Sequence, residues 1–377
     1  MSGQMSTAQP ERIRVAVVFG GRSSEHAISC VTAGSVLSVL DRERYDVVPI
    51  GITTDGRWVL GPDDPEQLTI TDGKLPEVAD VGGTVVLPTE RNAQLTVQAP
   101  GDVPEQLGTV DVVLPLLHGP YGEDGTLQGL LELAEVRYVG SGVLASALGM
   151  DKHYMKVVLS GAGVPVCRHA LVTPGPWPAQ RDRVMAEVDK LGWPVFVKPA
   201  RAGSSMGISK VAGPDELESA ILAAREHDPK VLVEEAVPGR EVECGVLEGA
   251  AGGPAQASVV GEIVMDGTHE FYDFEAKYLE DESHVSLAIP ADLPDAAAQQ
   301  IRRYAVEAFE TLSCEGLARV DFFYRPDGEV VLNEVNTMPG FTPTSMFPQL
   351  WAATGLDYPA LVDRLVTTAL NRPLGLR

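Results

Sequence analysis

The sequence of 377 residues contains few cysteines and an excess of negative charge. Its four cysteines, Cys30, Cys167, Cys244 and Cys314, lie far apart, without a CxxC pair or the spacing of a zinc site. Free thiols in a reducing compartment are therefore expected. Lys and Arg together number 29 against 53 Asp and Glu, which gives a net charge of −24. An acidic surface repels phosphate backbones and anionic lipids, so we expect neither nucleic acid nor a membrane as a partner.

Long apolar runs and the common nucleotide-binding fingerprints are also missing. No apolar run is long enough to cross a bilayer, and residues 1–12 lack the apolar centre of a signal peptide. These absences predict a cytoplasmic protein with a disordered extension over residues 1–12. No P-loop motif occurs, and the turn at Gly20 and Gly21 lacks the GxGxxG spacing of a dinucleotide site.

The elements that are present predict an α/β protein. Buried strands are expected at Ile13–Gly20, Tyr45–Ile52 and 110–117, with helices over about 24–40 and from about 126. Such alternation is typical of a parallel sheet, here in an N-terminal domain over residues 13–150.

Two further domains are expected after residue 150. A central domain, 151–238, would contain helices near 155–161, 183–191 and 216–226 and strands at 195–198 and Val231–Glu235. A strand-rich C-terminal domain, 239–377, would contain strands at 243–247 and 259–265 and a hairpin over 318–335. The polar segment at about 266–286 interrupts it and has the length of a functional lid.

The hairpin carries the clearest chemical signal. Residues two apart in a strand share a face, so Arg319 points the same way as Asp321, and Glu334 the same way as Asn336. If the register brings these faces together, three oxygen donors and one guanidinium meet. Such a donor set suits Mg²⁺ that also holds substrate phosphates. The alternative is an ordinary half-exposed hairpin.

Lysines are scarce, since the chain has only eight, and three lie in suggestive places. Lys198 ends an apolar strand and precedes a loop of Gly and Ser residues, including Ser204 and Ser205, whose backbone amides could face phosphate oxygens. Lys277 lies beside Tyr278 in the polar lid, which could close over a site and exclude water. Lys152 could equally be an exposed lysine at the start of a helix.

Two loops of the N-terminal domain could contact a ligand. Glu25 lies at the start of a helix, where it could hold a substrate ammonium or simply complement the helix dipole. His118 follows the carboxyl end of a strand, the usual ligand position in α/β folds, although a local hydrogen bond is the plainer interpretation.

Taken together, these motifs resemble the D-alanine–D-alanine ligases of the ATP-grasp superfamily, over nearly the whole chain from about residue 14 to 370. The matching blocks, in the order of the family, are GGRSSEHAIS, HGPYGEDG, GSGVLASALGMDK, VKPARAGSSMGISKV, VEEAVPGREVECGVL, YDFEAKY, ARVDFF and VLNEVNTMPGFTPTSMFP. The resemblance implies a three-domain fold that clasps ATP between the central and C-terminal domains, and ligation of two D-alanine molecules through an acyl phosphate for peptidoglycan synthesis.

The resemblance also implies roles for individual residues. The ATP site would comprise Lys152, Lys198, Ser204, Ser205, Glu234, Glu235, Val237, Glu241 and Lys277. Two Mg²⁺ ions, replaceable by Mn²⁺, would be held by Asp321, Glu334 and Asn336. The D-alanine sites would use Glu25, His118, Lys277, Ser345 and Met346, the last through its backbone, although leucine is commoner there. Catalysis would depend on Arg319, the Gly340 amide and the set Glu25, Ser204 and Tyr278.

Three alternatives remain open at this point. A D-alanine–D-lactate ligase would share the fold, but Tyr278 matches relatives that use amine nucleophiles. A nucleotide-binding regulator without turnover would not need the intact set of Glu25, Arg319 and Asp321. A nicotinamide dehydrogenase is the most remote alternative. A homodimer is expected from the resemblance alone.

Overall fold

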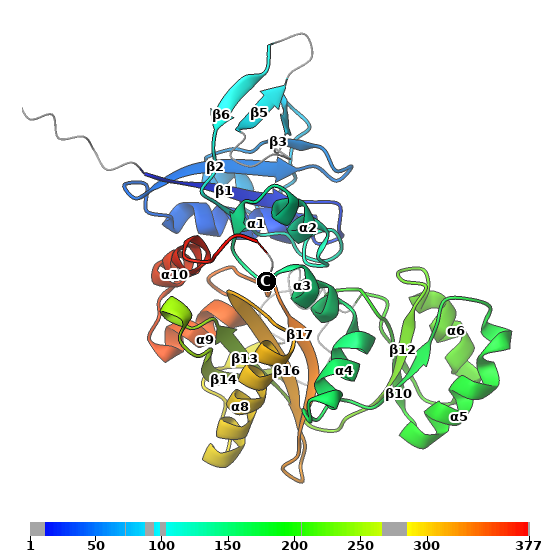
Figure 1. Ribbon diagram of the computed structural model, residues 1–377. Coiled ribbons are helices and arrows are strands. Elements are labelled where there is room, and N and C mark those ends of the chain that lie inside the picture. The colour runs from blue at the N-terminus through cyan, green and yellow to red at the C-terminus, as the bar shows by residue number, and fades with distance from the viewer. Residues whose placement is uncertain are drawn as a thin grey trace, which may run out of the picture.

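An eight-stranded mixed sheet forms the N-terminal part of the computed structural model, which describes residues 12–71, 73–86, 94–98, 103–204, 206–265 and 285–375. Its strand order is β6-β5-β4-β3-β2-β1-β7-β8 (Figure 1). The four parallel strands are β1 (Ile13–Gly20), β2 (Tyr45–Ile52), β7 (Val112–Pro115) and β8 (Arg137–Tyr138). The other four are antiparallel, namely β3 (Trp58–Leu60), β4 (Thr84–Val86), β5 (Leu95–Gln98) and β6 (Glu105–Gly108).

The expected parallel sheet is therefore confirmed for one half and wrong for the other. Parallel strands need a crossover, and α1 (His26–Val39) and α2 (Thr126–Leu133) supply it. Among the described residues, the connections from β2 to β3 and from β3 to β4 contain η1 (Pro65–Leu68) and turns but no longer helix, so the chain there returns as antiparallel strands.

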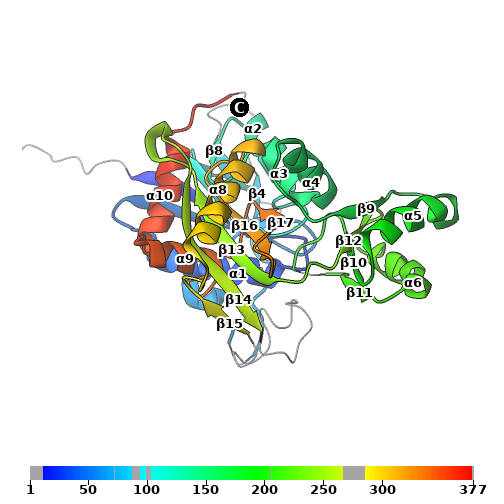
Figure 2. The ribbon, with the colours of Figure 1, turned by 90° about the horizontal axis from the view of Figure 1, so that it is seen from below.

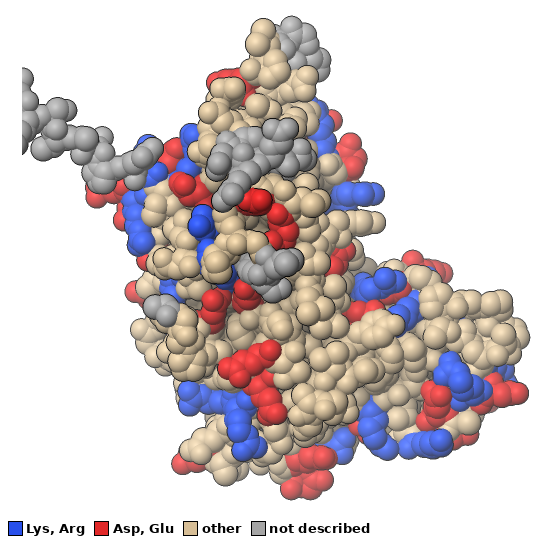
Figure 3. Space-filling model, viewed as in Figure 1, with Lys and Arg blue, Asp and Glu red and all other residues tan. Residues whose placement is uncertain are grey.

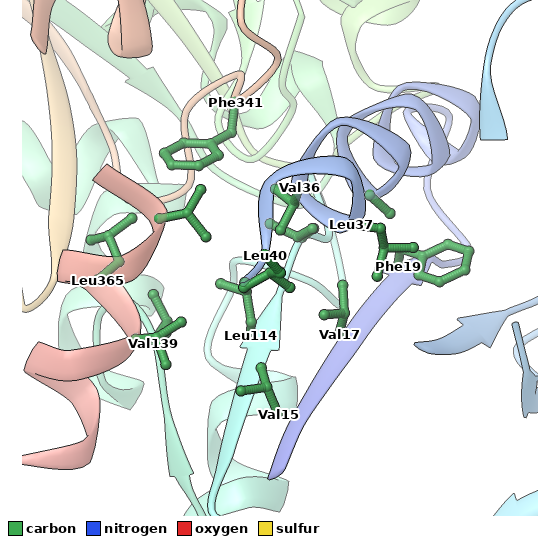
Figure 4. Close-up of a cluster of buried hydrophobic side chains, with 14 of the residues drawn as sticks. Val15, Val17, Phe19, Val36, Leu37, Leu40, Leu114, Val139, Phe341 and Leu365 are labelled. Atoms are coloured by element: carbon green, nitrogen blue, oxygen red, sulfur yellow. The ribbon is translucent and has the colours of Figure 1, made fainter. Parts of the chain in front are cut away.

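Alternate residues of β1 enter two apolar layers. Val15, Val17 and Phe19 pack towards Val36 and Leu37 of α1, as Figure 4 shows. Ala16 and Val18 face the opposite layer, which contains Leu127 and Leu131 of α2. Burial on both faces explains why β1 is a nearly continuous apolar run.

The last helix, α10 (Tyr358–Leu370), packs on the first sheet as well as on its neighbour α9 (Met346–Thr354) (Figure 1). Leu361 and Leu365 join the core of β1 and α1. The Tyr45 hydroxyl donates a hydrogen bond to Asp363 Oδ1 over 2.6 Å, and Arg44 forms an ion pair with the same carboxylate. The two ends of the sequence therefore share one hydrophobic core.

The central region is a small antiparallel sheet of order β11-β10-β12-β9. Its strands are β9 (His169–Val172), β10 (Val195–Pro199), β11 (Ser209–Val211) and β12 (Val231–Glu235). The helices α5 (Arg181–Leu191) and α6 (Pro214–Ala224) pack on it, with η2 (Trp177–Ala179) before them. In Figures 1 and 2 this unit projects from the rest of the molecule.

The C-terminal region is a five-stranded antiparallel sheet of order β15-β14-β13-β16-β17. Its strands are β13 (Arg240–Leu247), β14 (Gln256–Met265), β15 (Val285–Ala288), β16 (Leu317–Tyr324) and β17 (Val330–Asn336), with η3 (Ala250–Gly252) between β13 and β14. The hairpin expected over 318–335 is confirmed as β16 and β17.

Helices are more prominent in this region than the sequence suggested. The strand-rich prediction omitted α8 (Asp295–Thr311) and α9 (Met346–Thr354) as well as α10. Two earlier helices, α3 (Val143–Met150) and α4 (Lys152–Gly161), also contact it. Met155 and Leu159 of α4 share a core with Val320 and Leu332 of the hairpin. The domain boundaries at residues 150 and 238 stay a prediction.

The surface and the cysteines agree with the composition. On the face in Figure 3, acidic and basic side chains are intermixed among the described residues. No helix within the described part of the chain has the length and apolar composition needed to span a membrane. All four cysteines are free and buried, and burial raises their thiol pKa values, for example to about 11 for Cys167.

Candidate functional site

The hairpin brings the predicted polar groups onto one face. Arg319 is the register partner of Asn336, and Asp321 is the partner of Glu334. Arg319 donates through Nε and Nη2 to the two Asp321 oxygens, each over 2.8 Å. The Asn336 amide donates to Asp321 Oδ2 over 2.9 Å. The predicted convergence is therefore present, and the ordinary water-facing hairpin is wrong because Asp321 is 8% exposed.

The donor set fits a hard divalent cation. Asp321 and Glu334 offer carboxylate oxygens, and Asn336 can offer its amide oxygen. Within the described ranges, no three His, Cys, Asp or Glu side chains are arranged to hold a metal. The predicted site therefore depends on Asn336 and on oxygens that a ligand would bring.

Glu243 also belongs to this cluster, although it was not predicted from the sequence. It pairs in register with Asp321 across β13 and β16, and its Oε2 lies 2.9 Å from Arg319 Nε. Burial by itself lowers the pKa of Arg319, but the two carboxylates outweigh it and raise that pKa well above its ordinary value. The two-residue spacing from Glu241, which puts both side chains on one face of β13, was the available signal.

Glu241, predicted to be part of the ATP site, lies near this cluster. A hollow of about 80 Å³ is lined by apolar side chains and by the charged residues Glu241, Glu243, Arg319, Asp321 and Glu334. Glu241 and two of the three predicted metal ligands, Asp321 and Glu334, therefore border one space.

The lysines converge from two other elements. Lys198, on β10, places Nζ 2.6 Å from Glu234 Oε2 on the neighbouring strand β12. Burial by itself lowers the pKa of Lys198, but Glu234 raises it above its ordinary value. Lys152, at the start of α4, lies 3.2 Å from Glu334 Oε2 and donates to Ala202 O over 3.0 Å.

Lys156 is a second residue that the sequence did not single out. Its ammonium lies 3.3 Å from Glu234 Oε1, so Glu234 is shared by two lysines. Burial raises the pKa of Glu234, yet Lys156 and Lys198 together lower it to about 2. The spacing of four residues from Lys152, on one helix face, could have indicated it.

The glycine- and serine-rich loop reaches the N-terminal domain. The Ser204 hydroxyl donates a hydrogen bond to Glu25 Oε1, with Ser204 at a φ of +46°. A side-chain carbon at Gly203 or Gly119 would lie 2.8 Å from Glu25 Oε2. Glycine at both positions therefore permits the close approach of the Glu25 carboxylate.

Two titratable groups follow β7 and lie near Glu25. His118 Nδ1 is 3.1 Å from Met338 O, and its buried Nε2 has no hydrogen-bond partner. Burial lowers the pKa of His118, although Glu25 opposes this. Glu123 accepts the Gly119 amide hydrogen over 2.7 Å, and burial together with the Glu25 charge raises its pKa to about 8.

The remaining described residues of the predicted sites lie at the end of β12 and in the loop before α9. The Glu235 carboxylate binds Arg168 and Arg325, so any ligand contact there would be through the backbone. Val237 follows β12 and is partly buried.

The loop after β17 leads from the hairpin to α9. Gly340 lies in this loop, and Ser345 precedes α9, where its hydroxyl lies 2.8 Å from that of Thr342. Met346 is buried beside Leu350. Lys277, Tyr278, Ser205 and residues 266–284 of the lid predicted over about 266–286 lie outside the described residues, as do residues 1–11. The last two residues of that predicted lid belong to β15.

Comparisons with known proteins point to one family. The family model described as D-ala D-ala ligase N-terminus covers residues 14–141, and the one described as D-ala D-ala ligase C-terminus covers residues 158–367. A protein of Kineococcus radiotolerans named D-alanine–D-alanine ligase is 59% identical over 380 residues, covering 98% of this chain and 100% of that protein. One of Arthrobacter sp. (strain FB24) with the same name is 58% identical and covers 97% and 96%.

Among solved structures, the VanG D-Ala:D-Ser ligase from Enterococcus faecalis is 35% identical, with a TM-score of 0.78 and coverage of 95% of this chain and 100% of that chain. The two family models together match most of the chain, and both curated relatives cover nearly all of it at well over half identity. This chain therefore belongs to the D-ala D-ala ligase family.

Proposed function

We propose that this protein joins two D-alanine molecules into D-alanyl-D-alanine, with ATP converted to ADP and phosphate, for peptidoglycan precursors. The observation that carries the proposal is a continuous set of contacts between the three regions. Glu25 binds Ser204 of the loop, and Lys152 joins that loop at Ala202 to Glu334 of the hairpin. Groups suited to an ammonium, to phosphates and to a metal therefore border one another.

In the first step, the carboxylate of one D-alanine attacks the γ-phosphorus of ATP, the bond to ADP breaks, and an acyl phosphate forms. Glu25 would hold the ammonium of that D-alanine beside His118. Lys152, Lys198 and the loop with Ser204 and Ser205 would hold the phosphates. Phosphoryl transfer chiefly requires such positioning and charge neutralisation.

In the second step, the amine of the other D-alanine loses a proton and attacks the acyl carbon, and phosphate leaves. Arg319 and the Gly340 amide would stabilise the oxyanion of the tetrahedral intermediate. Ser345 and the backbone amide of Met346 would hold the carboxylate of this second D-alanine. Lys277 in the predicted lid would help to neutralise the phosphates, and Tyr278 would help Ser204 and Glu25 to hold the lid closed and exclude water.

The nucleotide and the metal would share the hairpin. Backbone groups from Glu234 to Val237, Glu235 included, would contact the adenine, and Glu241 the ribose. Asp321, Glu334 and Asn336 would hold two Mg²⁺ ions, for which Mn²⁺ can substitute. When bound, these ions would neutralise charge on the phosphates. Homodimer formation and a cytoplasmic location stay predictions.

The direct test is mass detection of D-alanyl-D-alanine after incubation with D-alanine, ATP and Mg²⁺. Controls omit ATP or replace D-alanine with L-alanine, and product in either control would contradict the proposal. Binding of ATP without any dipeptide would instead indicate a nucleotide-binding regulator.

A second arm tests the nucleophile. D-Lactate and D-serine are each offered with D-alanine across a range of pH. D-Serine is included because the VanG protein is described as a D-Ala:D-Ser ligase. Predominant formation of a mixed product when D-alanine is equally abundant would assign a different second substrate.

A further inference from the structure

Lys156 has no role in the reaction steps above, yet its surroundings are unusual for a lysine. None of its side-chain surface is exposed. Its ammonium donates a hydrogen bond to Asn333 O over 2.6 Å and lies 3.3 Å from Glu234 Oε1. Because a buried charge is costly unless it is paired, these contacts account for its retention in the interior.

Glu234 is divided between two ammonium groups. Its Oε1 faces Lys156, and its Oε2 lies 2.6 Å from Lys198 Nζ. Two positive charges and one negative charge leave an excess of one positive charge beneath the glycine- and serine-rich loop. In a chain with a net charge of −24, such a local excess favours an anion.

Lys156 also joins three elements. It lies on α4, while Glu234 lies on β12 of the central sheet and Asn333 on β17 of the hairpin. One turn earlier on α4, Lys152 donates through its backbone N–H to Ala200 O, at the start of the loop. The contacts of Lys156 therefore fix the distance between Lys198 and the hairpin.

We propose that Lys156 is a positioning residue for the nucleotide phosphates. It shares the Glu234 carboxylate with Lys198, so that Glu234 does not fully neutralise Lys198 and Lys198 keeps a fixed position relative to the hairpin. This inference rests on the proposed ATP-dependent function. Lys156 itself touches no phosphate, because its ammonium is enclosed by Glu234 and Asn333.

The test measures binding of Mg²⁺ and a non-hydrolysable ATP analogue by calorimetry, together with steady-state kinetics. Lys156→Gln keeps a donor for Asn333 O but loses the charge. We expect its Kd for the analogue to rise about tenfold, the scale of coupling between contacting charged groups. The KM for ATP should rise with it, while kcat at saturating ATP changes less. Lys156→Arg, which keeps the charge, should restore most of the affinity.

Arg372→Met is the matched control, because Arg372 is also buried and binds a carboxylate, Glu248, but lies outside the candidate site. Thermal unfolding is recorded for each variant. An unchanged Kd in folded Lys156→Gln, or an equal loss of affinity in Arg372→Met, would overturn the inference. Product formation by the parent protein is assayed separately, so a parent that binds the analogue but makes no dipeptide would refute the proposed function alone.

Discussion

Replacement of Arg319 by alanine separates catalysis from nucleotide binding. Arg319 is the proposed donor to the oxyanion, and removal of one such donor typically lowers kcat about 10²–10³-fold, or about 2.7–4 kcal/mol. The same guanidinium neutralises Asp321 and Glu243, whose side chains are 12% and 7% exposed. Loss of a buried partner typically costs about 3–5 kcal/mol of the free energy of unfolding. Arg319→Ala should therefore be both slow and less stable.

The assay must distinguish these two effects. ADP release is followed in a coupled assay at a temperature well below the Tm of the variant, and binding of the ATP analogue is measured by calorimetry. Arg372→Ala is the matched control, because Arg372 is buried, pairs with Glu248 and lies outside the candidate site. It should lose stability and keep kcat. An Arg319→Ala enzyme that keeps most of the parental kcat would refute the proposed role of the guanidinium.

Three further outcomes are expected. Ser204→Ala removes the hydrogen bond to Glu25 and should raise the KM for D-alanine, as measured by ADP release. The Kd of the ATP analogue should change little. A loss of nucleotide affinity without a change in the KM for D-alanine would contradict this prediction. The pKa of Glu123 is raised to about 8, so the stability it contributes is fully present below the ordinary value of 4.5 and is lost as pH rises through about 8. Glu123→Gln should therefore flatten the dependence of Tm on pH between these values, and an unchanged slope would exclude a raised pKa. Chelation by EDTA should abolish dipeptide formation, and excess Mg²⁺ should restore it. The Tm should change little, because Arg319 pairs with the Asp321 carboxylate and neutralises it without a metal. Full activity in EDTA would remove the proposed metal requirement.

The hairpin shows what a sequence can predict about such a site. Its polar residues alternate with apolar ones, and its turn contains Asp327 and Gly328, so strand periodicity predicted both the hairpin and the shared face of Arg319 and Asp321. The register of the two strands was assumed rather than predicted, and the structure shows that it pairs Asp321 with Glu334.

Residues that act through distant partners could not be predicted in this way. Lys156 and Glu234 are 78 positions apart, and no local pattern indicates that α4 reaches β12. The helix α8 is a different case. Its buried positions Ala297, Ile301, Ala305, Ala308 and Phe309 follow helical spacing, so the period of its apolar residues could have indicated this helix. The antiparallel arrangement of the other half of the first sheet was not predicted, because its strands are only three or four residues long and give a weak pattern.

The position of α10 has a consequence for how the chain acquires its structure during synthesis. Helix α1 and strands β7 and β8 are made long before α10, whose side chains Leu361 and Leu365 join the same core. That part of the core must wait, only partly covered, until α10 has been synthesised. Removal of α10 should therefore expose apolar surface on the first sheet and on α9, and lower the solubility of the protein.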